Sequence, residues 1–147
     1  MKFVQSSFDK NDPVGKDLLM EFLRSKGHET GENEDRYGID IITKKDGIEY
    51  LWEVEMKSKR PWTSREDFQF DSVSFLYRKA KWQDTPFWYV IICTETHAAI
   101  FCKSDIIFNE NYKQTINIFT QDRKGEDTFY RVPKELCIFV DPKEFRI

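Results

Sequence analysis

The sequence predicts one α/β (α+β) domain over residues 1–147, in which a mixed β-sheet is flanked by helices. Its length of 147 residues fits one domain and leaves little room for a second. Near the N-terminus apolar residues recur at helical spacing, and farther along they alternate or run together as they do in strands. A chain of this size buries roughly 70% of its unfolded surface, so a core can form without disulfides or metals.

Composition and charge exclude several classes of protein. Hydrophobic residues make up 39% of the chain and aromatic residues 16%, while the net charge is −3, which disfavours disorder. The longest apolar run, residues 87–93, is far shorter than the ~20 residues of a membrane helix. The N-terminus lacks the apolar core of a signal peptide. We therefore expect a soluble, cytoplasmic protein with no membrane partner.

Three cysteines, at positions 93, 102 and 137, all lie within apolar runs. Buried free thiols are favoured over a metal or redox site, because the number is odd and the segments are apolar. The two histidines, His28 and His97, are far apart, which argues against a zinc cluster.

The first element is predicted to be a helix over residues 13–26. Asp12 and Pro13 are typical of an N-cap and a first helical position, and Gly27 is placed to end the helix. The apolar residues at helical spacing are Val14, Leu18, Leu19 and Phe22. The polar, acidic segment 28–36 that follows is predicted to be a loop with room for one short strand.

Two strands, 37–43 and 48–58, are predicted to form a hairpin. The Asp46-Gly47 pair between them is a strong signal for a tight turn. The second strand alternates cleanly, with one face made of Tyr50, Trp52, Val54 and Met56 and the other of Leu51, Glu53, Glu55, Lys57 and Lys59.

After the hairpin we predict one helix and several strands. Residues 63–67 have the composition of a helix start, and Asp71-Ser72 offers a second one. The spacing of Val73, Leu76, Tyr77 and Ala80 predicts a helix that ends near Lys81 or Trp82. Residues 87–93 are predicted to form an interior strand and 98–102 its neighbour. Short strands are predicted at 116–120, 129–132 and 137–140, in a C-terminal extension, 104–147, that could supply a dimer surface or a substrate contact.

Charged residues on the hairpin form a candidate site. Glu55 and Lys57 share one face of the second strand, and an antiparallel hairpin can bring Asp40 beside Glu55. Glu21 falls at the rim of the apolar helix face. The acid-x-Lys spacing occurs three times, as often as chance predicts, but only at Glu55 does it lie inside a convincing strand.

This set of side chains is suited to phosphate chemistry. Two carboxylates can hold Mg²⁺, or Mn²⁺, which activates a water, while Lys57 orients that water or stabilises the charge on phosphorus. Glu21 could complete the site or hold a second ion. Residues 57–81 have a local charge of +4 and are expected to bind flanking phosphates. The basic residues assigned to that role are Lys59, Arg60, Arg65, Arg78, Lys79 and Lys81.

The order of the predicted elements resembles that of the PD-(D/E)XK nuclease superfamily. It consists of a helix with Glu, a strand with Asp, a strand with Glu-x-Lys, and then a helix and a strand. The resemblance covers residues 13–103 and implies an αβββαβ core, as in restriction endonucleases. It also implies that Asp40 and Glu55 bind the metal, that Lys57 is the catalytic lysine, and that Glu21 is the helix carboxylate of many members. The Pro of the motif is Ile39 here, and the Gln-x-x-x-Tyr pattern of the RecB-like branch is missing.

Other interpretations of the same residues remain open. The acidic strand face could be solvated and carry only weak cross-strand ion pairs. Glu53 could compete with Glu55 as a ligand, and Glu21 could belong to an exposed helix face. Trp62, beside the proposed site, could stack on a nucleobase.

The expected function is Mg²⁺-dependent hydrolysis of phosphodiester bonds in nucleic acid, with DNA favoured. The modest local positive charge suits structure-selective cleavage, end processing or work inside a larger complex, and a homodimer could supply two cuts. The alternative is a catalytically inactive module of the same fold that binds nucleic acid or protein. An unrelated α/β domain is the third possibility.

Overall fold

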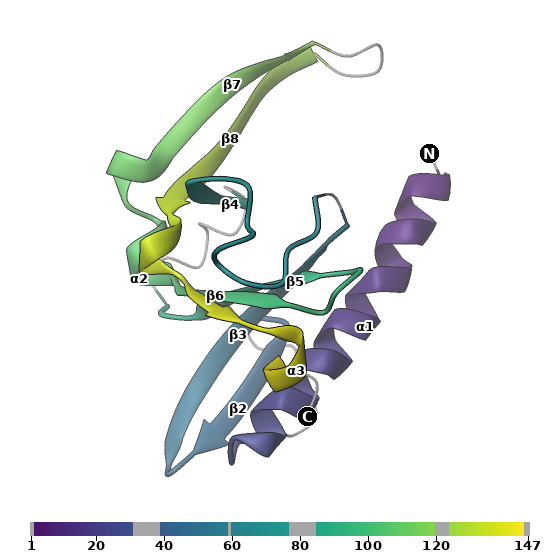
Figure 1. Ribbon diagram of the computed structural model, residues 1–147, viewed down its shortest axis with the longest axis vertical. Helices are drawn as coiled ribbons and strands as arrows, with labels where there is room; N and C mark the ends of the chain where they lie inside the picture. The colour runs from purple at the N-terminus through teal and green to yellow at the C-terminus, as the bar shows by residue number, and fades with distance from the viewer. Residues whose placement is uncertain (1, 31–38, 59, 77–84, 120–123, 146–147) are drawn as a thin grey trace.

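The computed structural model describes residues 2–30, 39–58, 60–76, 85–119 and 124–145. It has two β-sheets and three α-helices, a mixed α+β architecture as predicted (Figure 1). The larger sheet has six strands in the order β1-β2-β3-β5-β6-β9, and the smaller has three in the order β4-β8-β7. In chain order the elements are α1 Lys2–Ser25, β1 Glu29–Thr30, β2 Ile41–Lys45, β3 Ile48–Lys57, β4 Ser72–Leu76, β5 Trp88–Cys93, β6 Ala99–Lys103, α2 Ser104–Ile107, η3 Glu110–Tyr112, β7 Lys113–Phe119, β8 Lys124–Pro133, η4 Lys134–Leu136, β9 Ile138–Val140 and α3 Pro142–Phe145. Among these helices none is both long and apolar enough to cross a membrane.

Helix α1 ends where the sequence predicts but begins much earlier. Gly27 adopts a left-handed φ of 92°. Its backbone N–H donates to the oxygen of Arg24 and that of His28 donates to the oxygen of Leu23, as in a glycine C-cap. The predicted start at Pro13 is wrong, because α1 already begins at Lys2. A proline inside a helix removes one backbone donor and its ring crowds the carbonyl of residue i−4, yet a long helix can contain it when other interactions offset that cost. An Asp-Pro pair therefore does not by itself locate a helix start.

The predicted hairpin is confirmed in β2 and β3. The strands pair antiparallel from Ile41 opposite Trp52 to Lys45 opposite Ile48. Asp46 and Gly47 form the two-residue turn with φ values of 53° and 79°, both in the left-handed region that such turns require. Residues 37–38, with which the first predicted strand begins, lie outside the described part of the chain.

Segment 72–76 forms strand β4 and residues 63–67 form only bends and a turn, so the predicted helix is wrong over both segments. Val73 and Phe75 are buried while the serines on either side are not, which is a period of two. Each residue of β4 is paired antiparallel with β8, about 60 residues farther along the chain. The apolar spacing fitted both a helix and a strand, and this distant pairing selects the strand. Tyr77 and Ala80, the end of that predicted helix, lie outside the described residues.

Strand β5 lies parallel to β3, with Trp52 opposite Trp88 and Lys57 opposite Cys93, and antiparallel to β6. Both strands form as predicted. The three predicted C-terminal strands also form, as β7, β8 and β9, although β7 and β8 begin earlier than predicted and residue 120 lies outside the described part of the chain. Strand β9 pairs with β6 at the edge of the larger sheet, while β8 joins β7 to β4. The segment after residue 103 is thus built into both sheets, and the β7–β8 hairpin extends away from the larger one (Figure 1).

Both faces of the larger sheet are buried. One face packs against the smaller sheet, where the rings of Phe75 and Tyr89 are 4.8 Å apart. The other packs against α1, whose Leu19, Phe22 and Leu23 are buried. All three cysteines are free and buried, as predicted.

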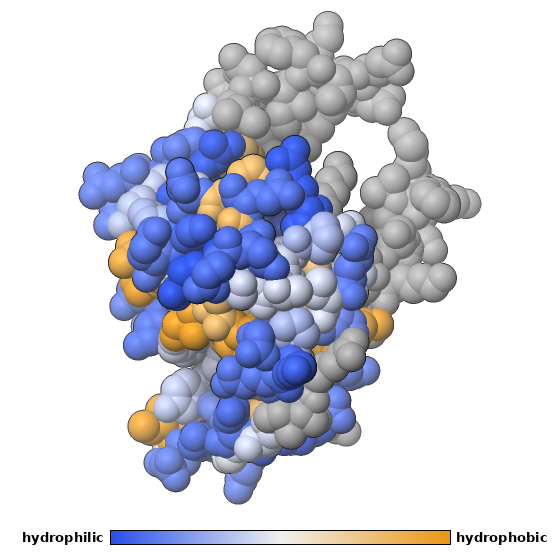
Figure 2. All heavy atoms as spheres, in the orientation of Figure 1, coloured by the Kyte–Doolittle hydropathy of each residue, from blue (hydrophilic) through white to orange (hydrophobic). Residues whose placement is uncertain are grey.

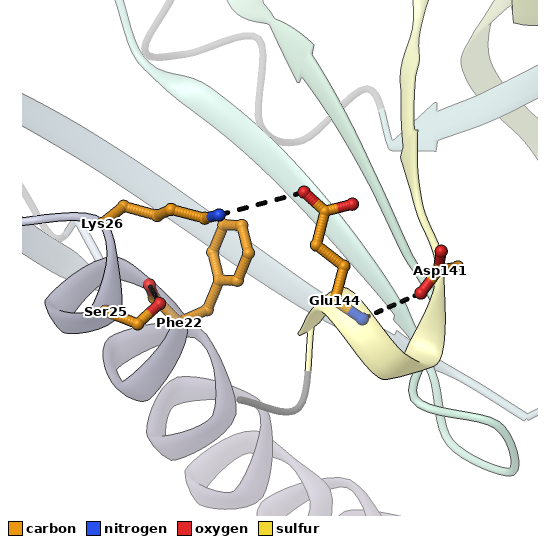
Figure 3. Close-up of polar contacts among 5 residues, drawn as sticks. All are labelled: Phe22, Ser25, Lys26, Asp141 and Glu144. Carbon is orange, nitrogen blue, oxygen red and sulfur yellow. Dashed lines mark hydrogen bonds and ion pairs between the residues drawn. The ribbon is translucent and has the colours of Figure 1, made fainter.

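Helix α3 lies beside the C-terminal end of α1 (Figure 3), and the Phe145 ring of α3 stacks on the Phe22 ring of α1. Lys26 lies 3.9 Å from Glu144 and 5.4 Å from the centre of the Phe22 ring. The backbone N–H of Glu144 donates to the side chain of Asp141, the residue just before α3. On the face seen in Figure 2, hydrophilic residues predominate and apolar residues form small separate groups.

Candidate functional site

The site residues of β3 point toward the smaller sheet. Leu51 on this face belongs to the core between the two sheets, whereas Trp52 and Val54 face α1. The predicted alternation of β3 is therefore confirmed. Glu53 is only 2% exposed, and Glu55 and Lys57 are half-buried. This face of β3 is not the solvated surface that the simplest alternative required.

Glu55 is held by a tyrosine of the neighbouring strand. The hydroxyl of Tyr89, itself 0% exposed, donates to Glu55 Oε1 over 2.5 Å. The same hydroxyl accepts the backbone N–H of Leu76 over 3.5 Å. Tyr89 thus links the Glu55 carboxylate to β4 and restricts its rotation. Because this bond uses Oε1, the other oxygen, Oε2, is the candidate ligand atom.

Lys57 lies at the end of β3, between the two sheets. Its Nζ donates to the backbone oxygen of Ser74 on β4 over 3.0 Å. An ammonium group has three donors, so this bond positions the side chain and leaves donors for a water or a phosphate oxygen.

Asp40 lies just before β2, against the backbone of β3. Its Oδ2 accepts the N–H of Val54 over 3.0 Å, and its Oδ1 lies 3.9 Å from Lys16 Nζ on α1. The β2–β3 register continued by one residue puts Asp40 level with Glu53. The hairpin therefore brings the Asp40 carboxylate to Val54, the residue before Glu55. It does not place Asp40 directly opposite Glu55.

Glu21 does not join this group. It is exposed, while the buried face of α1 is formed by Gly15, Leu19, Phe22 and Leu23. At 100° per residue, Glu21 lies roughly opposite the middle of that face. The sequence placed Glu21 at the rim because Val14 was counted as buried, but Val14 is 46% exposed. The α1 residue that reaches Asp40 is Lys16.

Across the described ranges, no three His, Cys, Asp or Glu side chains lie close enough together to hold a metal ion. The expected set of three carboxylates is thus not assembled. Mg²⁺ is often held by only one or two carboxylates, with waters and substrate phosphates completing its shell. Asp40 and Glu55 are the residues that fit such a role.

The basic residues assigned to phosphate binding divide into three groups. Arg60 is exposed, with its guanidinium 5.1 Å from the centre of the Phe70 ring. Arg65 instead has a structural role, since it donates to the Cys137 backbone oxygen over 2.8 Å and lies over Phe139. Lys59, Arg78, Lys79 and Lys81 lie outside the described residues.

A pocket of about 330 Å³ opens beside Lys57, between the larger sheet and β4. The residues that line it are Lys57, Arg60, Trp62, Phe68, Phe70, Ser72, Val73, Ser74, Ile91, Ile100 and Arg131. Trp62, the expected stacking residue, is only 3% exposed, whereas Phe70 is 45% exposed. Sequence reasoning missed Arg131, because only the pairing of Ser74 with Arg131 between β4 and β8 brings that residue here.

Comparison of the chain with protein-family models, curated proteins and solved structures finds no significant match.

Proposed function

We propose that the protein is a Mg²⁺-dependent nuclease that hydrolyses phosphodiester bonds, with DNA as the favoured substrate. The observation that carries this proposal is the position of Asp40. Its carboxylate is fixed on the backbone of Val54, next to Glu55 and three residues from Lys57. Asp40 is thereby attached to the same end of the strand that carries Glu55 and Lys57.

The order of the elements supports the same proposal. Helix α1 comes first, and the antiparallel strands β1, β2 and β3 follow it. A crossover then leads to β5, which lies parallel to β3. This is the order that the resemblance to the PD-(D/E)XK superfamily implies. The difference lies in the crossover, where the described residues contribute strand β4 in place of the expected helix.

In this proposal the chain's own residues divide the work of hydrolysis. Asp40 and Glu55 would hold Mg²⁺, which supplies an activated water and offsets charge on the phosphate. Tyr89 keeps Glu55 oriented. The free donors of Lys57 would orient the water and stabilise charge on the phosphorus oxygens. The water oxygen forms a bond to phosphorus and loses a proton to solvent, while the ester bond breaks and the leaving oxygen takes up a proton from solvent.

Lys16 would act as a counter-ion in the absence of metal. It lies 3.9 Å from Asp40 Oδ1 and is itself partly exposed. A long flexible side chain in that position can move away when a divalent cation binds, at little cost. A structure-selective enzyme, a homodimer or a subunit of a larger complex would each suit a chain with modest net charge.

The test is cleavage of plasmid, single-stranded and branched DNA with Mg²⁺ or Mn²⁺. We expect Asp40→Asn, Glu55→Gln and Lys57→Ala each to reduce the rate by roughly 100-fold or more. Glu21→Gln and Lys44→Ala are matched controls, because both side chains are exposed and lie away from the site. Both controls should cleave at the wild-type rate, and thermal unfolding should show that all variants are folded.

Equal cleavage by wild type and Lys57→Ala would contradict the proposal and indicate a contaminating nuclease. Metal or DNA binding without cleavage of any substrate would favour the catalytically inactive module instead. Loss of activity in Glu21→Gln would restore the helix carboxylate that the resemblance implies.

A further inference from the structure

We propose that the pocket beside Lys57 binds one terminal nucleotide of the substrate, with its phosphate monoester on Arg60 and Arg131 and its base against Phe68 and Phe70. This inference rests on the proposed nuclease function and specifies its substrate as a strand end that carries a phosphate.

The charge of the pocket selects an anion. Lys57, Arg60 and Arg131 line it, and the described residues of its lining include neither Asp nor Glu. Within the described part of the chain, neither arginine has a carboxylate within 4.0 Å. Cations left without acidic partners at a concave surface attract a negatively charged ligand. A phosphate monoester carries about −1.5 to −2 charges near pH 7, so it suits two arginines better than a singly charged phosphodiester.

Arg60 is held in a way that leaves its donors available. Its guanidinium carbon lies 5.1 Å from the centre of the Phe70 ring. A cation–π contact attracts the guanidinium through its charge and needs no carboxylate partner, so its N–H groups can donate to a ligand. A phosphate can accept two of them at once.

Apart from the basic residues, Ser72 and Ser74, the described residues of the lining are aromatic or aliphatic. Trp62, Phe68 and Phe70 form a chain of edge-to-face contacts, with ring centres 5.6 Å and 5.9 Å apart. Phe68 is half-buried and Phe70 exposed, so both rings have surface that a ligand can cover. A phosphate group gains no favourable contact from an aromatic surface, whereas a nucleobase stacks on it.

The size of the pocket limits the ligand to one nucleotide. Its volume of about 330 Å³ is near the lower end of the range for small-molecule sites. The pocket also shares Lys57 with the proposed catalytic group. A strand whose last nucleotide fills the pocket would therefore place a phosphodiester near Lys57, Glu55 and Asp40.

The wall of the pocket is held in place from several directions. Thr96 Oγ1 donates to the Trp62 backbone oxygen over 2.6 Å. Asp67 accepts the backbone N–H groups of Thr63 and Ser64. Lys134 Nζ donates to the Arg65 backbone oxygen over 3.2 Å. A loop fixed in this way loses little freedom on binding, which favours affinity.

The direct test is calorimetric binding in EDTA, with deoxyadenosine 5′- and 3′-monophosphate, deoxyadenosine and ribose 5-phosphate as probes. We expect at least one monophosphate nucleotide to bind at least 10-fold more tightly than either the nucleoside or the sugar phosphate. The double variant Arg60→Gln/Arg131→Gln should weaken nucleotide binding at least 10-fold. Lys44→Gln/Lys143→Gln removes the same charge from exposed residues outside the pocket and should leave binding unchanged.

Phe68→Ala separates the base from the phosphate, because Phe68 lines the pocket while Arg60 rests on Phe70. It should weaken binding of the nucleotide but not of ribose 5-phosphate. Equal affinity for nucleotide and sugar phosphate would overturn the nucleotide assignment, and so would nucleotide binding that the double arginine variant leaves unchanged.

Cleavage assays distinguish this inference from the proposed function. Oligonucleotides with a terminal phosphate should be cleaved at least 10-fold faster than the same oligonucleotides without it, and the double arginine variant should abolish the difference. Cleavage that ignores the terminal phosphate would overturn this inference while the nuclease stands. Nucleotide binding without cleavage of any strand would instead contradict the nuclease.

Discussion

At the scale of single residues, buried hydroxyl groups hold the polar side chains of the larger sheet. Tyr89 does so for Glu55, and Thr43 does so for His28. Thr43 is 1% exposed and accepts the indole N–H of Trp52 over 2.9 Å. Its own proton can then be donated to His28 Nδ1, 2.8 Å away, when the imidazole is neutral. Burial, with Lys45 as a second cause, lowers the pKa of His28 below its usual value.

We predict that His28 makes the protein less stable in mild acid. Because the folded state lowers the pKa of His28, the unfolded chain binds a proton more readily. The stabilisation is complete above the ordinary pKa of about 6.5 and is lost as the pH falls through the folded-state pKa. Between pH 7.5 and pH 5.5, the thermal unfolding midpoint of wild type should fall by roughly 1–3 °C more than that of His28→Gln. The same fall in both proteins would exclude this role for His28.

At the scale of elements, the β2–β3 hairpin positions the candidate site. Its two-residue turn sets the register, and the register puts Asp40 at Val54 and aims Glu53, Glu55 and Lys57 toward the smaller sheet. A slip of one residue would turn all these side chains toward α1. The turn therefore determines the chemistry of the site although it lies at the far end of the hairpin.

Gly47→Ala is expected to destabilise the protein by about 1 kcal/mol. A Cβ added at Gly47 would meet no atom within 4 Å, so the cost comes only from the φ of 79°. Asp46→Asn is the matched control, because asparagine tolerates the φ of 53° at that position. Urea unfolding measures both variants. No loss in Gly47→Ala, or an equal loss in the two variants, would argue against this turn.

At the scale of the whole molecule, the two sheets share one core. Phe75 of β4 is 0% exposed and packs on Tyr89 of β5. The residues that form the pocket also come from both sheets, since Lys57 lies on β3, Ser74 on β4 and Arg131 on β8. The stability of the fold and the shape of the pocket thus depend on the same contact between sheets.

Phe75→Ala should destabilise the protein by about 3–5 kcal/mol, because it opens a cavity between the sheets. Phe70→Ala is the control, since Phe70 is 45% exposed and should cost much less. Unfolding followed by tryptophan fluorescence and by far-UV circular dichroism should give one coincident transition in each protein. Two separated transitions would show that the sheets unfold as independent units.

What the sequence by itself determined follows from short-range patterns. The Asp46-Gly47 pair and the alternation along β3 predicted the hairpin and its two faces, because a turn and a period of two are properties of a few neighbouring residues. The apolar runs predicted β5, β6 and the burial of the cysteines for the same reason.

Only the tertiary structure decided that 72–76 is a strand, that Glu21 faces away from the sheet, and that Arg131 lies beside Lys57. An apolar spacing compatible with both a helix and a strand takes the form that its distant partner allows, and β8 pairs with β4. The orientation of α1 depends likewise on which of its apolar residues the sheet can cover. These outcomes depend on contacts between segments far apart in the chain, and no local pattern contains them.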